Sequence, residues 1–350
     1  MSVIVTGKNS LKQLSKIIAS DFKSAKVFVI TDDNTSLVCL PLFKIHIGKL
    51  SFIEIKIKAG EKHKTLNTCE NIWRILIKHN ADRRSLIINL GGGTVCDVGG
   101  FAASVFKRGI AFINVPTTLL AMTDAAIGGK TGVDFLHYKN MIGTFTQPNA
   151  TIIYKDFLKT LPSREINSGK AEIIKHALIA DKGLWNLITK DFTITDTVLK
   201  KSIALKTKII AKDFKENNLR KLLNFGHTIG HAIESYYLQK GMDILHGEAV
   251  GAGMIVELYL SSLKNELFLS DLEQIGLFLY SHFSLRETLS YKQLEKFLIA
   301  DKKNKNGKIN FTLLHKIGNA SIDNFCNKEE IKEGINFYNY CNARLKNNRT

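Results

Sequence analysis

The stretch LIINLGGGTVCDVGGF, residues 86–101, runs from an apolar strand through three consecutive glycines into a predicted helix. Glycine adopts backbone angles that other residues avoid, and it lets a phosphate approach the N–H groups at a helix start. The spacing differs from the G-x-G-x-x-G pattern of the usual dinucleotide-binding turn. A tight turn without a ligand is the alternative. Three glycines in a row cost folding entropy, which favours a turn that binds a ligand.

Strands and helices alternate on both sides of this stretch. Strands are predicted at 26–33, 52–60, 85–93, 111–118 and 150–154, with a helix at 64–79. From about residue 165 the strand pattern fades, and helices are predicted at 169–180, 196–217, 224–238, 246–264, 270–283 and 328–345. Strand–helix alternation is typical of an α/β domain with a mostly parallel sheet. The sequence therefore predicts a Rossmann-like α/β domain over residues 1–165 and a mainly α-helical domain over residues 166–350.

Composition narrows the class of protein. The chain has 350 residues, of which 45% are hydrophobic, and it contains no apolar run long enough to span a membrane. The start of the chain lacks a signal-peptide pattern, and five scattered cysteines form no C-x-x-C pair, so we expect a cytoplasmic protein with reduced thiols. The net charge is +17, but the lysines are spread along the chain. We therefore expect neither a nucleic-acid nor a membrane partner.

Two histidines in NFGHTIGHAIE, residues 224–234, raise the question of a metal site. His227 and His231 stand four residues apart, which places them on one face of a helix. Such a pair can ligate a metal, or it can be two histidines on an ordinary buried helix. Gly226 and Gly230 weaken this helix and indicate that another segment comes close to it.

A lysine-bearing glycine turn, IGGKTG at 127–132, is not a phosphate-binding P-loop. That motif requires a glycine where this chain has Asp124. What remains is Lys130 on a glycine turn, with Lys139 and Asn140 on a second polar turn at 139–143. Together they can hold a phosphate or a carboxylate, although solvated loop lysines are the alternative.

Seven stretches together resemble the 3-dehydroquinate synthase family, in the family's order and over roughly residues 25–310. They are AGEKHKT (59–65), GGGTVCDVGGFAA (91–103), RGIAFINVPTTLLAMTDAAIGGKTGVD (108–134), KNMIGTF (139–145), AEIIKHALI (171–179), LRKLLNFGHTIGHAIE (219–234) and HGEAVGAGM (246–254). The resemblance implies the dehydroquinate synthase-like fold. It also implies a small phosphorylated sugar acid as substrate, and a homodimer.

The resemblance implies a metal site that differs from the histidine pair. In the family, the glutamate of AExxK, the first histidine of HTxGH and the histidine of HGEA are the ligands. Carried over, these are Glu172, His227 and His246. One carboxylate and two imidazoles suit Zn²⁺ (or Co²⁺) and leave positions open for substrate oxygens. His231 then belongs to the substrate shell, and the pairing of His227 with His231 is the second choice.

The implied reaction converts 3-deoxy-D-arabino-heptulosonate 7-phosphate to 3-dehydroquinate and phosphate, a step of the shikimate pathway to aromatic amino acids. It uses NAD⁺ that is regenerated in each turnover. Transient oxidation of a hydroxyl acidifies the neighbouring C–H, phosphate leaves by β-elimination, and an intramolecular aldol step closes the ring. The substrate's own phosphate can act as the base, so the protein mainly holds geometry.

Family positions also imply roles for other residues. The implied substrate-binding and catalytic residues are Asp124, Lys130, Asn140, Lys175, Lys206, Arg220, Asn224, His231 and Lys302, with Lys303 nearly interchangeable with Lys302. The implied NAD-binding residues are Asp32, Asn34, Glu61, Lys64, Gly93, Thr94, Val95, Cys96, Asp97, Thr117, Thr118, Lys130, Lys139, Phe157, Leu158, Lys159 and Thr160. Cys96 stands where the family has a small residue, and it either crowds the pyrophosphate turn or points into the core. KENNLR, at 215–220, also departs from the family pattern.

Three alternatives remain at this point. A sugar-phosphate cyclase of the 2-deoxy-scyllo-inosose or valiolone synthase type would share the NAD turns and metal ligands. Arg220 and Asn224 favour a substrate with a carboxylate instead. A polyol dehydrogenase would release NADH, and a basic nucleic-acid-binding protein would bind DNA with a steep salt dependence.

Overall fold

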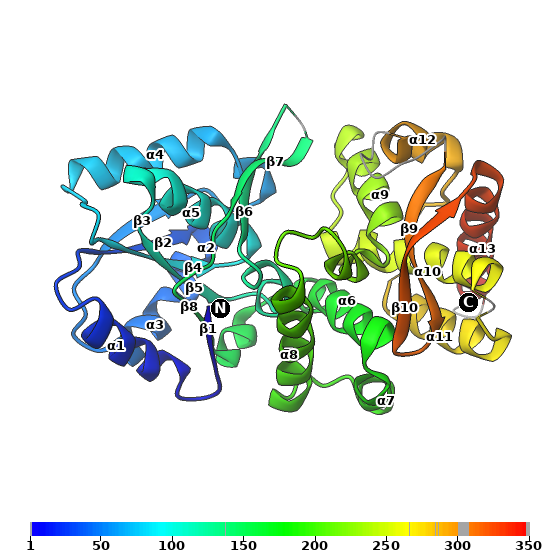
Figure 1. Cartoon of the computed structure of the whole chain (residues 1–350), viewed down its shortest axis with the longest axis horizontal. Coiled ribbons are helices and arrows are strands. Elements are labelled where there is room, and N and C mark those ends of the chain that lie inside the picture. Colours follow the sequence, from blue (N-terminus) through cyan, green and yellow to red (C-terminus); the bar gives the residue numbers. More distant parts are fainter. Residues whose placement is uncertain are drawn as a thin grey trace. The chain divides into compact units, whose positions relative to one another are not determined.

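The computed structural model describes residues 2–347, except for residues 137, 266, 284, 286 and 300–307. The chain divides into two compact units, Met1–Ile166 and Asn167–Thr350. Each unit is described below by itself (Figure 1). In the described part of the chain, no helix combines the length and the apolar character that crossing a membrane requires.

The first unit is an α/β domain. Its strands are β1 (Val3–Thr6), β2 (Val27–Asp32), β3 (Ile53–Ile57), β4 (Leu86–Gly91), β5 (Ala111–Pro116), β6 (Lys130–Phe135), β7 (Tyr138–Phe145) and β8 (Ala150–Ile153). Its helices are α1 (Ser10–Asp21), α2 (Asp33–Val38), α3 (Leu40–Ile47), α4 (Leu66–Lys78) and α5 (Gly93–Val105), with short helical turns η1 (Glu61–His63), η2 (Phe106–Arg108), η3 (Ala121–Ala125) and η4 (Lys155–Thr160).

Six strands of this unit form one parallel sheet in the order β1-β8-β5-β4-β2-β3. Figure 1 shows α4 and α5 on one face of the sheet and α1 and α3 on the other. Strands covered on both faces are mostly apolar, as β4 is, and every residue of β4 is buried, including Asn89. The strand order reverses between β2 and β4, which is where open α/β sheets bind their ligands, at the carboxyl ends of the strands.

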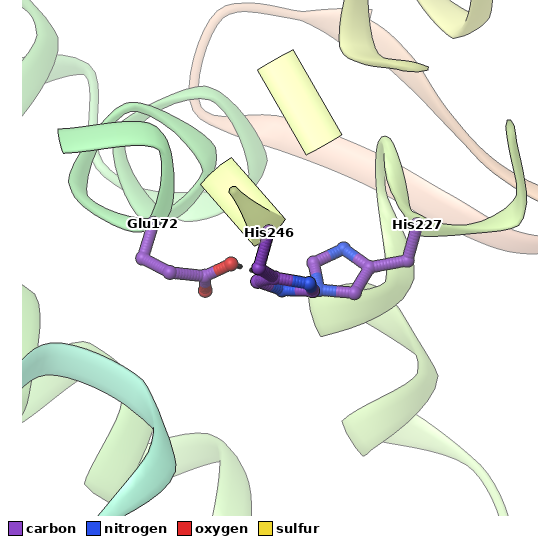
Figure 2. A group of neighbouring side chains, drawn as sticks. All are labelled: Glu172, His227 and His246. Atoms are coloured by element: carbon purple, nitrogen blue, oxygen red, sulfur yellow. Dashed lines mark ion pairs between the residues drawn. The ribbon is translucent and has the colours of Figure 1, made fainter. Parts of the chain in front are cut away.

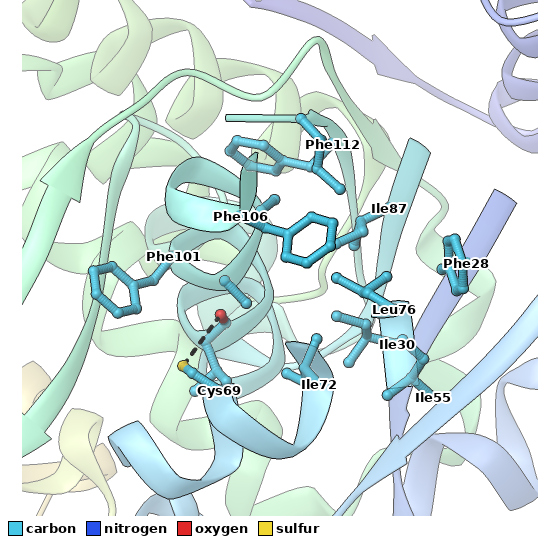
Figure 3. Packing of buried hydrophobic residues seen from close by; sticks show 14 of the residues in the cluster. Phe28, Ile30, Ile55, Cys69, Ile72, Leu76, Ile87, Phe101, Phe106 and Phe112 are labelled. Carbon is cyan, nitrogen blue, oxygen red and sulfur yellow. Dashed lines mark hydrogen bonds between the residues drawn. The ribbon is translucent and has the colours of Figure 1, made fainter. Parts of the chain in front are cut away.

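The core on the α4–α5 face of the sheet explains why these helices form where they do (Figure 3). Cys69, Ile72 and Leu76 recur at helical spacing on α4, and each is fully buried. They pack with Phe28 and Ile87 from the strands. The predicted strands and the predicted helix at 64–79 are confirmed, with the helix beginning at Leu66.

A two-stranded antiparallel hairpin, β6–β7, occupies much of the two stretches predicted as polar turns. The chain does turn at residues 127–129, with Gly128 at φ +117° and Gly129 at φ +65°, but the second predicted turn, at 139–143, is part of a strand, and that prediction is wrong. Lys130 begins β6, and Asn140 lies in β7. The hairpin contains Gly132 opposite Gly143, and a Cβ on Gly143 would lie 2.3 Å from the carbonyl oxygen of Thr131. Gly132 and Gly143, which the sequence analysis assigned to turns, thus allow the two strands to lie close together. The short strand β1 was also not predicted.

The second unit is mainly helical, as predicted. Its helices are α6 (Ser163–Ala180), α7 (Lys182–Lys190), α8 (Asp196–Lys212), α9 (His227–Gln239), α10 (His246–Lys264), α11 (Leu269–His282), α12 (Tyr291–Ile299) and α13 (Lys328–Asn347), with the turn η5 (Leu219–Asn224). An antiparallel hairpin, β9 (Ile309–Lys316) and β10 (Asn319–Cys326), was not predicted. Its turn contains Gly318 at φ +82°, a left-handed conformation that suits glycine.

Helices α9 and α10 run antiparallel and touch backbone to backbone. A Cβ on Gly253 of α10 would lie 2.1 Å from the carbonyl oxygen of Gly226 and 2.7 Å from the amide nitrogen of Gly230. A Cβ on Gly230 would lie 3.0 Å from the Cα of Val250. The expectation that another segment approaches the glycines of NFGHTIGHAIE is confirmed, and that segment is α10.

We predict that Gly253→Ala destabilises the protein, because the new methyl group would clash with backbone atoms, which cannot move away as a flexible side chain could. The loss should be about 3 kcal/mol in the free energy of unfolding, measured by urea titration. Gly276→Ala on α11 is the matched control, since the nearest heavy atom to its Cβ is 3.9 Å away. That control should be neutral or should gain up to about 1 kcal/mol from helix propensity. Equal stabilities of the two variants would contradict the close packing.

Candidate active site

The predicted NAD-binding residues of the first unit mostly follow the carboxyl ends of parallel strands. Asp32 ends β2, the triple glycine begins at the end of β4, and Thr117 follows β5. Since β2, β4 and β5 are consecutive in the sheet, their carboxyl ends share one edge. Glu61 and Lys64 follow β3 in the same way, and residues 157–160 follow β8. The sequence therefore gathers its candidate cofactor residues along one edge.

The triple glycine forms a bare backbone turn into α5. Gly92 is the N-cap of that helix and supplies no side chain to its first N–H groups. A Cβ on Gly91 would lie 2.5 Å from the Cβ of Val95, and one on Gly92 would lie 3.1 Å from the Cγ2 of Thr118. Unsatisfied N–H groups and the helix dipole make such a start suitable for a phosphate. The turn fits the pyrophosphate of a dinucleotide.

Cys96 lies inside the fold. It is buried, and its Sγ is 3.8 Å from the carbonyl oxygen of Gly91. Burial raises the pKa of this thiol far above its ordinary value, so it stays protonated. Of the two alternatives for this departure from the family pattern, the structure has the side chain pointing into the core.

A buried lysine organises the polar groups beside α5. Lys64 Nζ donates to the Asp97 carboxylate and to the Asn140 Oδ1, each at 2.6 Å. Burial disfavours the Lys64 charge, but the carboxylates of Asp97, Glu61 and Asp134 together outweigh burial and raise the pKa of Lys64 above its ordinary value. Glu61 joins this group, because its carboxylate lies 3.8 Å from Lys64 Nζ. Glu61 also accepts from Thr94 Oγ1 at 2.9 Å and lies 3.4 Å from Lys139 Nζ. Predicted cofactor residues thus form one connected network with Asn140, which was predicted for the substrate.

Sequence reasoning missed one member of this network. Asp134 accepts a hydrogen bond from the backbone N–H of Asn140 at 2.7 Å, and its own N–H donates to the carbonyl oxygen of Lys64 at 2.8 Å. Asn140 has φ +53°, a conformation that asparagine tolerates better than most residues. Asp134 therefore helps to hold the strained residue that faces Lys64.

The remaining predicted residues of the first unit have varied surroundings. Asp32 caps α2 by accepting from the N–H groups of Asn34 and Thr35. Phe157 and Leu158 are buried, whereas Lys159 is exposed and pairs with Asp156 at 2.8 Å. The other positions are Thr160, whose hydroxyl donates to the Phe157 carbonyl, Thr118, whose hydroxyl accepts from the Ala121 N–H, and Asp124, in the π-helical turn η3.

We predict that Lys64→Met destabilises the first unit, because it leaves the Asp97 carboxylate largely buried without its cation. The loss should be about 3 kcal/mol in the free energy of unfolding. Lys159→Met is the matched control, since it removes an exposed ion pair and should leave the unfolding transition unchanged. Urea titration of both variants measures the difference, and a silent Lys64→Met would contradict the network.

Three potential metal ligands converge in the second unit. Glu172 on α6, His227 at the start of α9 and His246 at the start of α10 point toward one another (Figure 2). Each offers one ligand atom, and these atoms lie within 4.8 Å of one another. Glu172 and His227 are buried, and His246 is partly buried. A buried carboxylate with two imidazoles suits a divalent cation such as Zn²⁺.

The close fit of α6 against α10 places two of these ligands. A Cβ on Gly247, next to His246, would lie 1.9 Å from the carbonyl oxygen of Ser168. The N–H of Gly247 donates to the Ser168 hydroxyl at 3.0 Å. Ser168 stands one helical turn before Glu172, so this contact brings the carboxylate to the first residue of α10.

Neighbouring groups orient the two imidazoles. The Nδ1 of His227 lies 3.2 Å from the carbonyl oxygen of Phe225, which can only accept, so Nδ1 carries the proton. In the neutral ring, Nε2 of His227 then presents a lone pair, and it lies 3.6 Å from the Glu172 carboxylate. For His246, Nδ1 lies 3.4 Å from the Glu234 carboxylate. Second partners of this kind fix ring orientation in metal sites, and sequence reasoning missed Glu234.

His231 lies beside this group. Its ring centroid is 5.2 Å from that of His227 and 6.0 Å from that of His246. It also belongs to a second possible ligand group with Glu234 and His246. Among the described residues, no group of three potential ligands within 4.8 Å contains both His227 and His231. The geometry therefore favours Glu172, His227 and His246 as a ligand set over the pairing of His227 with His231.

Cationic side chains are buried in the same unit. Lys175 is almost fully buried and forms an ion pair with Glu172. Lys206 on α8 and Arg220 on η5 are also buried, and α8 packs against η5. Arg220 Nη1 donates to the Phe214 carbonyl at 2.6 Å. Burying a cation is costly unless it is paired, and Lys175 has the Glu172 carboxylate as its partner.

Asn224 and Lys302 are the two other residues predicted to bind the substrate. Asn224 Nδ2 donates to the Glu216 carboxylate at 3.0 Å, and Glu216 belongs to the segment that departs from the family pattern. Lys302, like Lys303, lies outside the described residues.

Comparison with known proteins decides the family. The family models for the N-terminal and C-terminal parts of 3-dehydroquinate synthase match residues 54–168 and 169–304. The chain belongs to the 3-dehydroquinate synthase family. A relative of that name from Parabacteroides distasonis is 40% identical to it, over 96% of this chain and 97% of the relative.

Two solved structures share the fold of this 3-dehydroquinate synthase family member at 26% identity. One is 2-deoxy-scyllo-inosose synthase complexed with carbaglucose-6-phosphate, NAD⁺ and Co²⁺, with a TM-score of 0.83 and 95% of each chain covered. The other is 2-epi-5-epi-valiolone synthase from Streptomyces hygroscopicus with NAD⁺ and Zn²⁺ bound, with a TM-score of 0.85 and 97% of each chain covered. The predicted fold class, a Rossmann-like domain followed by a mainly helical one, is confirmed.

Proposed function

We propose that this protein is an NAD- and metal-dependent carbon–oxygen lyase with 3-dehydroquinate synthase activity. It converts 3-deoxy-D-arabino-heptulosonate 7-phosphate to 3-dehydroquinate and phosphate, in the shikimate route to chorismate and the aromatic amino acids. The observation that carries this proposal is the convergence of Glu172, His227 and His246 in a chain 40% identical to a 3-dehydroquinate synthase.

The residues present fit both cofactors. The bare glycine turn at the start of α5 suits the pyrophosphate of NAD, and the buried carboxylate with two imidazoles suits Zn²⁺ or Co²⁺. When bound, NAD supplies a transient acceptor for hydride, and the metal supplies a Lewis acid for substrate oxygens. The structural relatives bind the same pair of cofactors, which supports this assignment.

The protein's own residues mainly hold the substrate and set its geometry. Arg220, with its planar guanidinium, suits a carboxylate, and Asn224 beside it on η5 can donate to the same group. Lys175 and Lys206 bring buried positive charge for the phosphate or carboxylate. His231 can exchange a proton with a substrate hydroxyl. In the first unit, Asp124, Lys130 and Asn140 stay predicted substrate residues. Lys302, outside the described residues, also stays a predicted substrate residue.

The NAD assignment rests on the edge of the sheet in the first unit. We propose that Gly93 to Asp97 meet the pyrophosphate, with Asp32 and Asn34 near a ribose and Glu61 and Lys64 at the nucleotide. The further proposed contacts are Thr117, Thr118, Lys139 and residues 157–160. What supports them is their common position after the strands of one sheet.

The cellular setting and assembly are also proposals. A cytoplasmic location fits the five scattered cysteines, which form no C-x-x-C pair. A homodimer rests on the family resemblance. Zn²⁺ or Co²⁺ is the proposed resident metal, because the ligand set contains two imidazoles and a carboxylate.

The runner-up is a sugar-phosphate cyclase that acts on a substrate without a carboxylate. The two cyclases named above share the fold but only 26% identity, whereas the 3-dehydroquinate synthase relative shares 40%. The buried Arg220 on η5 further supports a carboxylated substrate.

We predict that the protein releases phosphate from 3-deoxy-D-arabino-heptulosonate 7-phosphate and that a chelator stops the release. Glu172→Gln should lower the rate at least about a hundredfold, because it removes a charged ligand and not merely an outer partner. The control Glu70→Gln changes an exposed carboxylate paired with Arg74 and should keep the wild-type rate.

Two outcomes would contradict this proposal in different ways. Wild-type turnover by Glu172→Gln would exclude this glutamate as a ligand. No phosphate release by the wild type, with net NADH formation from a polyol, would indicate a dehydrogenase of the same fold.

A further inference from the structure

A buried glutamate on α10 contacts the start of the helix that carries His227. Glu257 is fully buried, and its carboxylate accepts from the N–H of Gly226 at 2.6 Å and from the N–H of Ile229 at 3.2 Å. Gly226 is the N-cap of α9 and has no side chain with which to satisfy these donors. Glu257 therefore replaces the missing cap from a neighbouring helix.

The peptide between Phe225 and Gly226 links Glu257 to His227. Its N–H donates to the Glu257 carboxylate, and its carbonyl oxygen lies 3.2 Å from Nδ1 of His227. The structure contains no cis peptide bond among its described residues, so this N–H and C=O point in opposite directions. One rigid plane thus has the carboxylate on one side and the imidazole on the other.

The backbone angles show that this plane has an alternative orientation. Phe225 (φ −56°, ψ 126°) and Gly226 (φ 80°, ψ −12°) have the angles of a type II turn. Types I and II differ mainly by a rotation of the central peptide through about half a circle. In the rotated form, the carbonyl oxygen would face the Glu257 carboxylate and leave Nδ1 of His227. A buried anion therefore selects the form that holds the imidazole.

We propose that Glu257 is a positioning residue for His227, acting through the Phe225–Gly226 peptide. It fixes the carbonyl that receives the Nδ1 proton, and the lone pair of Nε2 is thereby turned toward Glu172. An N–H bonded to a carboxylate also polarises its own peptide, which strengthens the bond that the carbonyl accepts. The inference deepens the proposed function and rests on it, since it assigns His227 to the metal.

The first test measures Co²⁺ affinity of the full-length metal-free protein by the visible absorption of the bound ion. Glu257→Gln keeps the size of the side chain but loses the charge and places an amide N–H₂ near backbone donors. Its dissociation constant for Co²⁺ should rise about 10–100-fold, as for other outer partners of metal ligands.

The matched control is Glu330→Gln at the start of α13. Glu330 likewise accepts from a backbone N–H, that of Asn327 at 2.7 Å, and it pairs with Lys264. The control should bind Co²⁺ as the wild type does, even if it loses comparable stability. A folded Glu257→Gln protein with wild-type Co²⁺ affinity would overturn the inference.

The second test needs no folded variant at position 257. In metal-free wild-type protein labelled with ¹⁵N-histidine, NMR distinguishes the two neutral tautomers of each ring, and loss of one signal in His227→Asn assigns it. His227 should carry its proton on Nδ1, and a proton on Nε2 would overturn the inference. A wild-type protein that binds no Co²⁺ would instead contradict the proposed function.

Discussion

The backbone contact between α9 and α10 is the constraint on which the second unit depends. Gly226 and Gly230 on one helix and Gly253 on the other allow an approach that any Cβ would prevent. Gly247 plays the same part between α10 and α6. The proposed ligands stand on these three helices, so their spacing follows from helix packing and not from flexible loops. A site held by packed helices is well suited to a fixed coordination geometry.

The two units provide their candidate binding groups in different ways. The first uses the end of a sheet, where backbone N–H groups at the start of α5 are left for an anion and Lys64 ties the surrounding side chains together. The second uses side chains that are costly to bury, among them Glu172 and Lys175. Their mutual ion pair offsets part of that cost, and a bound divalent cation would change it further.

Much of the architecture could be predicted from local sequence patterns. The site residues were predicted mainly from the family motifs. The mostly apolar strand β4 and the helical spacing of Cys69, Ile72 and Leu76 can both be recognised in the sequence. The hairpin β6–β7 could not, because its glycines and lysines read as turn residues. Asp134, Glu234 and Glu257 were missed for a related reason. Each acts on a group that only tertiary packing brings near, and a single glutamate on a helix normally indicates an exposed face.

The glycine contacts also bear on how such a protein can diverge. Side chains on the outer faces of α9 and α10 can change without altering the separation of the two axes, because the helices meet through backbone atoms at Gly230 and Gly253. Gly253 has no such latitude, since even the smallest addition meets the main chain of the opposite helix. The spacing between the backbones that carry His227 and His246 is therefore a property of the helix pair itself.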